Sequence, residues 1–510
     1  MLLSTAVVLT FISCDKNLKD KTAAPADNSS ENSLMSAKEI NTTIETQFSQ
    51  TGYFEWKNAN IKLLWSALQQ QGDGMMCIGY KPISEGDIDN KISTLNINSS
   101  DWKDAKQQVL NLILQSERKT NPDLQLNDLE VWKENKLPVI DVKIANIETI
   151  KLLRASNLIR YVEPMAYDPI ADQDKAVQNA TGDGSGGSGC GGYVGNTSLV
   201  SGTDYTTITP NTKASWNYSY HNIQQAWTKS TGAGIKVMVI DTGVDPDQDN
   251  FTTGFNQGLS SGRTFQKMTT MPNQTSADDG CGHGTTMSGA VAAPRGTDGN
   301  SCGVAYNCNF IICRAANDVY IDESSEVKGV SDAYTYAADD TSVRLISMSL
   351  GRINSNGQIK DAINYAYGKG KLMFCAGGTS YSWDTWLVGV IFPANLPNVQ
   401  AITGVQDKST LSACADCHKG KEIDYVVVME RAKDGFHQIS TAISGDVPTT
   451  VGGSSVSTAD ASGIAALVWS RFPNYTREDV LNKLTTTASL YPNKNKNFGW
   501  GKLNADAATN

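Results

Sequence analysis

Short, mostly apolar runs separated by amphipathic segments recur between residues 215 and 507. Four of these runs are predicted strands: 235–240, 345–350, 372–376 and 399–403. Such runs are typical of parallel strands that are buried on both faces. Between two of them, Ile359, Ile363 and Ala366 stand at helical spacing. The alternation of strands and helices predicts an α/β domain with a doubly wound, mostly parallel sheet.

A smaller α+β pattern lies upstream, between residues 46 and 165. Strands are predicted at 75–80, 139–144 and 158–162, and helices at 102–115 and 147–153. We interpret these elements as part of the order β-α-β-β-α-β, which is typical of a ferredoxin-like fold and needs one further strand between the first helix and residue 139. The chain is therefore expected to hold two folded domains.

Polar segments precede and separate these domains. Residues 14–45 are rich in Ser, Asn and Lys and predict a flexible tether. Residues 166–214 predict an exposed linker, because glycine and serine dominate 182–192. These glycines are not expected to bind phosphate, since no Gly-Lys-Ser/Thr follows them.

The first 13 residues, 1–13, hold a short apolar run that ends before Cys14. The run is too short to cross a bilayer and is typical of a secretory signal peptide. It also resembles a bacterial lipoprotein signal. That resemblance implies export to the cell envelope, a lipid on Cys14 and attachment to a membrane. An ordinary signal peptide with an incidental cysteine is the alternative, and either kind of export permits disulfides.

The composition argues against some classes of function. The 510 residues include 43 basic and 53 acidic side chains, a net charge of −10, and 40% are hydrophobic. The acidic balance argues against nucleic acid as a partner, because nucleic acid would need a basic surface. The apolar content is enough for a large core. Only 4 histidines are present, so a metal site built mainly from imidazole has few candidates.

Three segments carry residues suited to nucleophilic catalysis. Asp241 ends a predicted strand, His283 lies between two glycines before a helix of small residues, and Ser455 follows a glycine turn at a helix start. Each has an ordinary structural explanation: a loop-capping carboxylate, a core histidine and a helix cap. Together they supply a nucleophile, a base that titrates near neutrality and a carboxylate that orients the base.

These segments resemble the motifs of the subtilisin-like serine peptidases, the subtilases. The similar stretches are Asp241-Thr242-Gly243, His283-Gly284-Thr285 and Gly453-Ser454-Ser455, with later landmarks at 392–394 and 499–505. The resemblance implies that Ser455 is the nucleophile, that His283 is the base and then the acid, and that Asp241 orients His283. It also implies a substrate-binding wall made by Ser349, Leu350 and Gly351.

The function implied is an exported serine endopeptidase, made as a zymogen, that cleaves polypeptides through an acyl-enzyme. Residues 46–165 would be its propeptide and intramolecular inhibitor, and 215–507 its catalytic domain. The resemblance implies no required cofactor and allows structural calcium, for which the sequence identifies no ligands.

One departure from the family leaves a second function open. Subtilases carry an asparagine that donates a hydrogen bond to the oxyanion, and Gly378 stands at the corresponding position. Gly378 and Ser454, or Thr379, would then shape the oxyanion hole. Losing one donor costs on the order of 10²–10³ in turnover. The alternative is a non-catalytic or very weakly active subtilase-fold module that binds peptides at the cell surface.

Two cysteine patterns have more than one interpretation. Cys414-Ala415-Asp416-Cys417-His418 matches a c-type haem attachment motif, but a disulfide or free thiols suit its predicted loop better. Cys281, two residues before His283, is either half of a disulfide or a redox-sensitive thiol.

Overall fold

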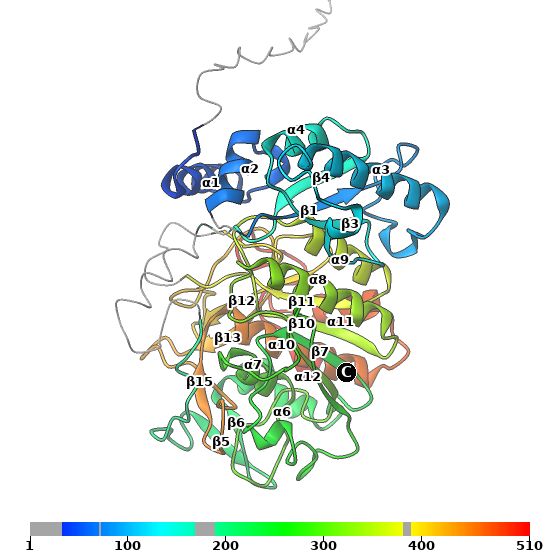
Figure 1. The fold of residues 1–510 in the computed structure, drawn as a ribbon. Coiled ribbons are helices and arrows are strands. Elements are labelled where there is room, and N and C mark those ends of the chain that lie inside the picture. Colours follow the sequence, from blue (N-terminus) through cyan, green and yellow to red (C-terminus); the bar gives the residue numbers. More distant parts are fainter. Residues whose placement is uncertain (1–32, 71–72, 168, 170–188, 381–388) are drawn as a thin grey trace, which may run out of the picture. The chain divides into compact units, whose positions relative to one another are not determined.

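The computed structural model describes residues 33–70, 73–167, 169, 189–380 and 389–510 (Figure 1). Residues Met35–Asn510 form one compact unit. The expected signal peptide, Cys14 and residues 170–188 of the expected linker lie outside the described residues. Within the described ranges, every helix is too short or too polar to cross a membrane.

A seven-stranded sheet forms the centre of the C-terminal domain, in the order β13-β12-β11-β10-β7-β9-β8. All neighbouring strands pair in parallel. The strands are β7 (Lys236–Asp241), β8 (Phe265–Thr269), β9 (Asn309–Arg314), β10 (Val343–Met348), β11 (Leu372–Ala376), β12 (Gln400–Gln406) and β13 (Ile423–Glu430). The strands predicted from apolar runs correspond to β7, β10, β11 and β12. The predicted doubly wound parallel sheet is therefore confirmed.

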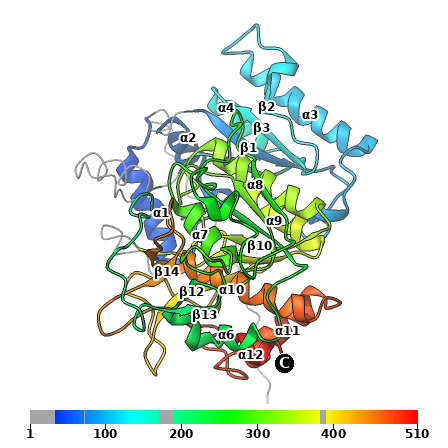
Figure 2. The same ribbon diagram turned by 90° about the horizontal axis from the view of Figure 1, so that it is seen from below.

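Alternate residues of β7 enter two separate cores, as the two-residue repeat of a strand requires. Met238 and Ile240 join a core that includes α8 (Ser324–Asp339) and α9 (Gly357–Gly368). Val237 and Val239 join a second core that includes α7 (His283–Ala292) and α10 (Gly453–Arg471). Figures 1 and 2 show these helices beside the sheet. Because helices cover both faces, the strands are apolar along most of their length.

The order of the sheet reverses at β7. From β7 the chain continues to β8 and β9 on one side, and β10 to β13 then extend the sheet on the other. The carboxyl ends of β7 and β10 are therefore neighbours at the switch point, where α/β proteins collect their reactive groups. Asp241 ends β7 and Ser349 directly follows β10.

The remaining elements of this domain lie around the central sheet. Two antiparallel pairs are formed by β5 with β6 and by β14 with β15. The elements are β5 (Tyr205–Ile208), β6 (Thr212–Ser215), η4 (Trp216–His221), α6 (Ile223–Ala226), η5 (Asp249–Phe251), β14 (Gln438–Ser440), β15 (Thr449–Val451), α11 (Arg477–Thr487) and α12 (Ala505–Ala508).

The N-terminal domain has a four-stranded antiparallel sheet in the order β2-β3-β1-β4. Its elements are α1 (Ala37–Thr51), η1 (Trp56–Asn58), α2 (Ile61–Gln70), β1 (Met75–Tyr80), η2 (Ile92–Thr94), α3 (Ser100–Glu117), η3 (Leu126–Asp128), β2 (Glu130–Trp132), β3 (Val139–Lys143), α4 (Ile147–Arg154) and β4 (Ile159–Pro164). The β-α-β-β-α-β order from β1 to β4 is that of a ferredoxin-like fold. The predicted fold of this domain is therefore confirmed.

The predicted tether at 14–45 is wrong for its last part, because α1 begins at Ala37. Ser36 and Glu39 form a capping box at the start of this helix. Ile40, Ile44 and Phe48 are buried at helical spacing. The polar average of the segment conceals this apolar stripe, so the domain boundary expected at residue 46 falls inside a helix.

The predicted linker at 166–214 is also wrong from residue 189 onward. Residues 205–208 and 212–215 are the hairpin strands β5 and β6. Asn196 N–H donates to the carbonyl of Pro448 at 2.8 Å, which fixes the segment before this hairpin to the C-terminal domain. A glycine-rich composition predicts a flexible backbone, but it gives no information about such long-range contacts.

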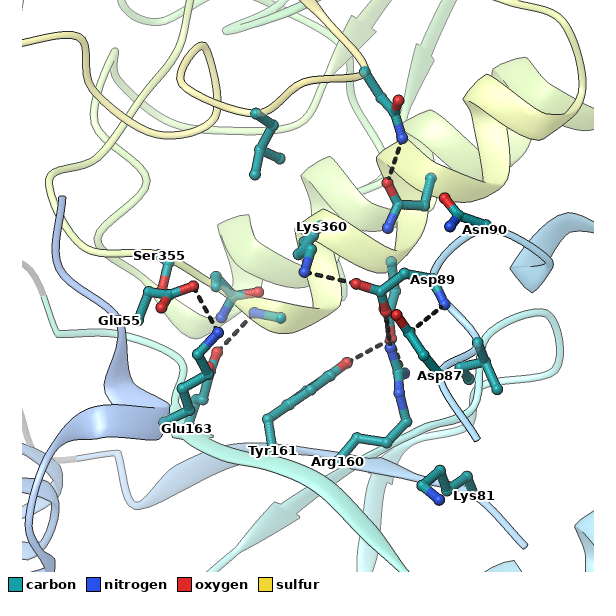
Figure 3. Close-up of a pocket in the computed structure, with 18 of the residues that line it drawn as sticks. Glu55, Lys81, Asp87, Asp89, Asn90, Arg160, Tyr161, Glu163, Ser355 and Lys360 are labelled. Atoms are coloured by element: carbon teal, nitrogen blue, oxygen red, sulfur yellow. Dashed lines mark hydrogen bonds and ion pairs between the residues drawn. The ribbon is translucent and has the colours of Figure 1, made fainter. Parts of the chain in front are cut away.

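Charged and polar contacts join the N-terminal domain to α9. Arg160 makes a two-pronged ion pair with Asp361, at 2.6 and 2.8 Å, and Tyr161 Oη donates to the same carboxylate at 2.8 Å. Glu163 Oε2 accepts a 2.6 Å hydrogen bond from Gly357 N–H at the start of α9. These residues line a cavity of about 800 Å³ between β4 and α9 (Figure 3).

Candidate active site

A buried carboxylate–imidazole pair lies at the switch point of the sheet. Asp241 Oδ1 is 2.7 Å from His283 Nδ1, and the side chains are 0% and 4% exposed. Asp241 ends β7 and His283 is the first residue of α7, so the contact joins a strand end to a helix start. Thr242 N–H donates to the same Oδ1 at 2.8 Å and holds the carboxylate in place.

The surroundings of His283 favour its charged form. Burial by itself lowers the pKa of the imidazole. The charge and the hydrogen bond of Asp241 act in the opposite direction, as do the charges of Asp279 and Asp318. The net effect raises the pKa of His283 above its ordinary value. Such surroundings stabilise the imidazolium that forms when a histidine accepts a proton.

Asp279 organises the turn that carries His283, and the sequence reasoning missed it. The carboxylate is 4% exposed. It accepts hydrogen bonds of 2.7–3.0 Å from Thr242 Oγ1, the N–H groups of Cys281, Gly282 and Thr285, and Thr285 Oγ1. Asp279 therefore ties the turn after β7 to the start of α7. A carboxylate four residues before a Gly-flanked histidine was the signal available in the sequence.

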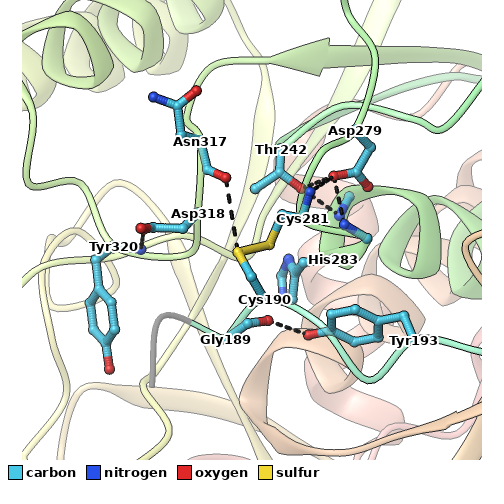
Figure 4. Close-up of a disulfide and its surroundings, with 12 residues drawn as sticks. Gly189, Cys190, Tyr193, Thr242, Asp279, Cys281, His283, Asn317, Asp318 and Tyr320 are labelled. Carbon is cyan, nitrogen blue, oxygen red and sulfur yellow. Dashed lines mark hydrogen bonds between the residues drawn. A yellow bond between two sulfur atoms is a disulfide. The ribbon is translucent and has the colours of Figure 1, made fainter. Parts of the chain in front are cut away.

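A disulfide fixes a second segment beside His283. Cys190 is bonded to Cys281, and Gly191 N–H donates to the carbonyl of Cys281 at 3.0 Å (Figure 4). The ring of Tyr193 lies edge-on to His283, with 6.0 Å between the ring centroids. Cys281 is therefore half of a disulfide. The segment 189–193, which belongs to the predicted linker, covers one side of the imidazole.

Ser455 lies in the first turn of α10. The helix starts at Gly453, whose φ of +88° and close approach to Thr379 Oγ1 suit only glycine. The Ser455 N–H has no acceptor within the helix, because it belongs to the first turn. Within the described part of the chain, the Ser455 hydroxyl makes no hydrogen bond, and none joins it to His283. Catalytic hydrogen bonds are often long before substrate binds and shorten in the complex with substrate.

The expected substrate wall lies next to the serine. Ser349 Oγ donates to the carbonyl of Ser455 at 2.9 Å. Gly351 N–H donates to Val319 O at 3.1 Å, and Gly351 O accepts from Ile321 N–H at 3.1 Å. The backbone N–H and C=O groups of Gly351, in the expected substrate wall, are thus bonded to the chain's own residues.

The groups expected to shape the oxyanion hole are bonded to one another. Gly378 N–H donates to Ser454 Oγ at 3.1 Å, and Ser454 N–H donates to Thr379 Oγ1 at 3.0 Å. The hydroxyls of Ser454 and Thr379 are also 3.0 Å apart. The segment 378–379 is therefore hydrogen-bonded to the start of α10. Neither Gly378 nor Ser454 presents a free donor beside Ser455.

Two groups of carboxylates could hold a cation. Asp249, Asp298 and Asp446 each bring an oxygen within 4.8 Å of the others, as do Asp318, Asp322 and Glu326. In the first group, Asp249 Oδ1 is buried and has no hydrogen-bond partner among the described residues. An orphaned carboxylate oxygen of this kind suits calcium, which prefers oxygen ligands.

The chain belongs to the subtilase family. Residues 232–501 match the family's model, which carries the description Peptidase_S8, Subtilase family. The resemblance predicted from the three sequence segments is therefore confirmed. The matched range includes Asp241, His283 and Ser455.

Several characterised proteins are similar to this chain over its C-terminal domain. Alkaline elastase YaB of Bacillus sp. (strain YaB) is 27% identical over 279 residues, which is 55% of this chain and 65% of that protein. Subtilisin Savinase of Lederbergia lenta is 26% identical over 279 residues, which covers 92% of that protein. Among solved structures, MycP1 from Mycobacterium smegmatis is 21% identical, with a TM-score of 0.45 and coverage of 60% of this chain and 88% of that chain.

Proposed function

We propose that this protein is an exported serine endopeptidase that is made as a zymogen. The observation that supports the proposal most is the buried 2.7 Å contact between Asp241 and His283 at the switch point of a subtilase sheet. A carboxylate in that position holds the imidazole in one tautomer, with Nε2 left to exchange a proton with a nucleophile.

In the proposed mechanism, Ser455 Oγ attacks a peptide carbonyl carbon while His283 Nε2 takes the hydroxyl proton. The carbonyl π electrons move to the oxygen, and the Ser455 N–H at the start of α10 stabilises this oxyanion. When the C–N bond breaks, His283 returns the proton to the leaving amine. Water then releases the acyl group by the same steps in reverse order.

The N-terminal domain is proposed to be the inhibitory propeptide. The guanidinium of Arg352, which directly follows the expected substrate wall, donates to the carbonyls of Met165 and Tyr167 at 2.8 and 2.6 Å. Arg352 is 1% exposed. The end of the N-terminal domain is thus bound to the residue that follows the expected substrate wall, which supports an inhibitory role for this domain.

Export to the bacterial cell envelope, with a lipid on Cys14, remains part of the proposal. The disulfides Cys190–Cys281 and Cys414–Cys417 support an oxidising compartment. For structural calcium, the residues Asp249, Asp298 and Asp446 would hold the ion. Its charge would relieve the repulsion among these carboxylates and stabilise the fold.

A fluorophosphonate probe tests the catalytic proposal directly. Full-length protein, before and after limited proteolysis, is expected to label after proteolysis and to hydrolyse casein. The Ser455→Ala variant is expected to do neither, with an unchanged melting temperature as the control for folding. Wild-type protein that folds and is nicked but never labels would favour a second function, the non-catalytic peptide-binding module. Gly378 and the absent Ser455–His283 hydrogen bond are the observations that favour this alternative.

A further inference from the structure

The Cys-x-x-Cys-His segment at 414–418 lies directly against Gly378. Cys414 and Cys417 are joined by a disulfide, so neither thiol is available to attach a haem. Cys417 pairs with Thr379 in an antiparallel bridge, and His418 N–H donates to the carbonyl of Gly378 at 3.0 Å. The disulfide-bonded turn therefore places His418 beside Gly378, the position at which the family has its oxyanion asparagine.

The imidazole of His418 fills the space that a side chain at 378 would need. A Cβ built on Gly378 would lie 2.4 Å from His418 Nδ1, and the φ of +117° at this position also excludes most other residues. Glycine at 378 therefore leaves room for the imidazole of His418, which occupies the space of a side chain at that position.

The two ring nitrogens of His418 have different surroundings. Residue His418 is 4% exposed, and its Nε2 lies 2.7 Å from Ser380 Oγ. Its Nδ1 is buried and makes no hydrogen bond within the described residues. Buried polar atoms are nearly always paired, and an exception in a native protein calls for an explanation such as a catalytic role.

The protonation of this ring suits a hydrogen-bond donor. Burial lowers the pKa of His418 to about 4, against a hydrogen bond between the ring and the backbone of Gly389, so the imidazole is neutral near pH 7 and carries one N–H proton. When the Ser380 hydroxyl donates to Nε2, that proton is on Nδ1. This nitrogen is then a neutral donor beside Gly378.

We propose that His418 Nδ1–H is the side-chain donor of the oxyanion hole and takes the role of the missing asparagine. This proposal rests on the proposed peptidase function. As the Ser455 Oγ–C bond forms, the carbonyl oxygen gains the π electron pair and accepts hydrogen bonds from Ser455 N–H and His418 Nδ1–H. When the C–N bond breaks, the electron pair returns to the carbonyl and both hydrogen bonds weaken. Ser380 is a positioning residue that sets the tautomer of the ring.

Two substitutions of His418 distinguish the loss of its hydrogen-bond donor from the loss of its packing. His418→Phe keeps a ring and removes the donor, and we expect kcat to fall by about 10²–10³ with little change in KM. His418→Gln keeps an amide donor and is expected to recover part of the loss. The matched control is His221→Gln, since His221 is also a fully buried imidazole but has both nitrogens bonded, to Leu503 O at 2.8 Å and Val428 N–H at 2.9 Å. A folded His418→Phe enzyme with wild-type kcat overturns the proposal.

A second measurement needs no variant. In wild-type protein labelled with ¹⁵N-histidine, a peptide boronic acid forms a tetrahedral adduct on the serine whose oxygen mimics the oxyanion. The Nδ1–H resonance of His418 is expected to move on binding, and an unmoved resonance in a protein that forms the adduct overturns the proposal. Wild-type protein that forms no adduct and labels with no fluorophosphonate overturns the peptidase function, and the role of His418 falls with it.

Discussion

Asp241 Oδ1 and His283 Nδ1 lie 2.7 Å apart, although 42 residues separate them in the sequence. The contact connects the carboxyl end of β7 with the first residue of α7. It decides the tautomer and the basicity of the imidazole, and its removal is the most direct test of the site.

Asp241→Asn is expected to reduce kcat/KM by about 10⁴, because the amide no longer stabilises the imidazolium. In wild-type protein the pKa of His283 is raised above its ordinary value, so activity should rise with pH through a midpoint above 6.5. In the variant the pKa of His283 should no longer be raised, so the residual activity should increase with pH through a lower midpoint. A pH profile of kcat/KM for both proteins makes the comparison. An unchanged midpoint in the variant would contradict the assigned role of Asp241.

Asp279→Asn is expected to lower the stability and the activity together. The amide nitrogen can no longer accept one set of the hydrogen bonds that hold the His283 turn. Leaving buried donors without an acceptor costs about 1–3 kcal/mol. The matched control is Asp278→Asn, since Asp278 is the exposed neighbour in the same turn. Urea unfolding of the two variants in a Ser455→Ala background measures the difference, and equal stability would show that the turn does not depend on Asp279.

The contact between the N-terminal domain and α9 is expected to weaken as the pH rises. Burial raises the pKa of Glu163 to about 7, against the hydrogen bond from Gly357 and the charge of Arg352. The folded state therefore binds a proton that the unfolded state has released between the ordinary pKa of 4.5 and about 7. Stability falls by up to about 3 kcal/mol as the pH rises through that window.

Glu163→Gln keeps an acceptor for Gly357 N–H and removes the titration. Unfolding of the Ser455→Ala protein at pH 5 and pH 8 should show the loss of stability, and the additional Glu163→Gln change should reduce it. Glu148→Gln, on the exposed face of α4, serves as the control. A pH dependence that is the same with and without Glu163 would exclude this carboxyl as its source.

The disulfide Cys190–Cys281 is expected to contribute more to stability than Cys414–Cys417. Their sequence separations are 91 and 3 residues, and in the chain-entropy account a longer closed loop restrains the unfolded chain more. Replacing both cysteines of the first pair by serine should cost about 2–4 kcal/mol. Thermal melts of the two double variants compare the pairs, and a larger loss for the short loop would be contrary to the expectation.

The sequence by itself determined four strands of the central sheet (β7, β10, β11 and β12), the parallel class of the sheet and the order of Asp241, His283 and Ser455 along the chain. Strands buried on both faces must be apolar over several consecutive residues, so their positions are visible locally. The family motifs are local as well, since each consists of adjacent residues around one turn. The polar tether was wrong for a related reason: Ile40, Ile44 and Phe48 matter by their spacing, which average composition hides.

Only the tertiary structure decided which distant groups meet. Asp279 accepts a hydrogen bond from Thr242 across 37 residues, Cys190 reaches Cys281 across 91 residues, and His418 occupies the space beside Gly378. None of these contacts has a local sequence period, because each depends on loops that the sheet brings to the same edge. A side chain's neighbours, and thus its chemistry, follow from the packing of the whole domain.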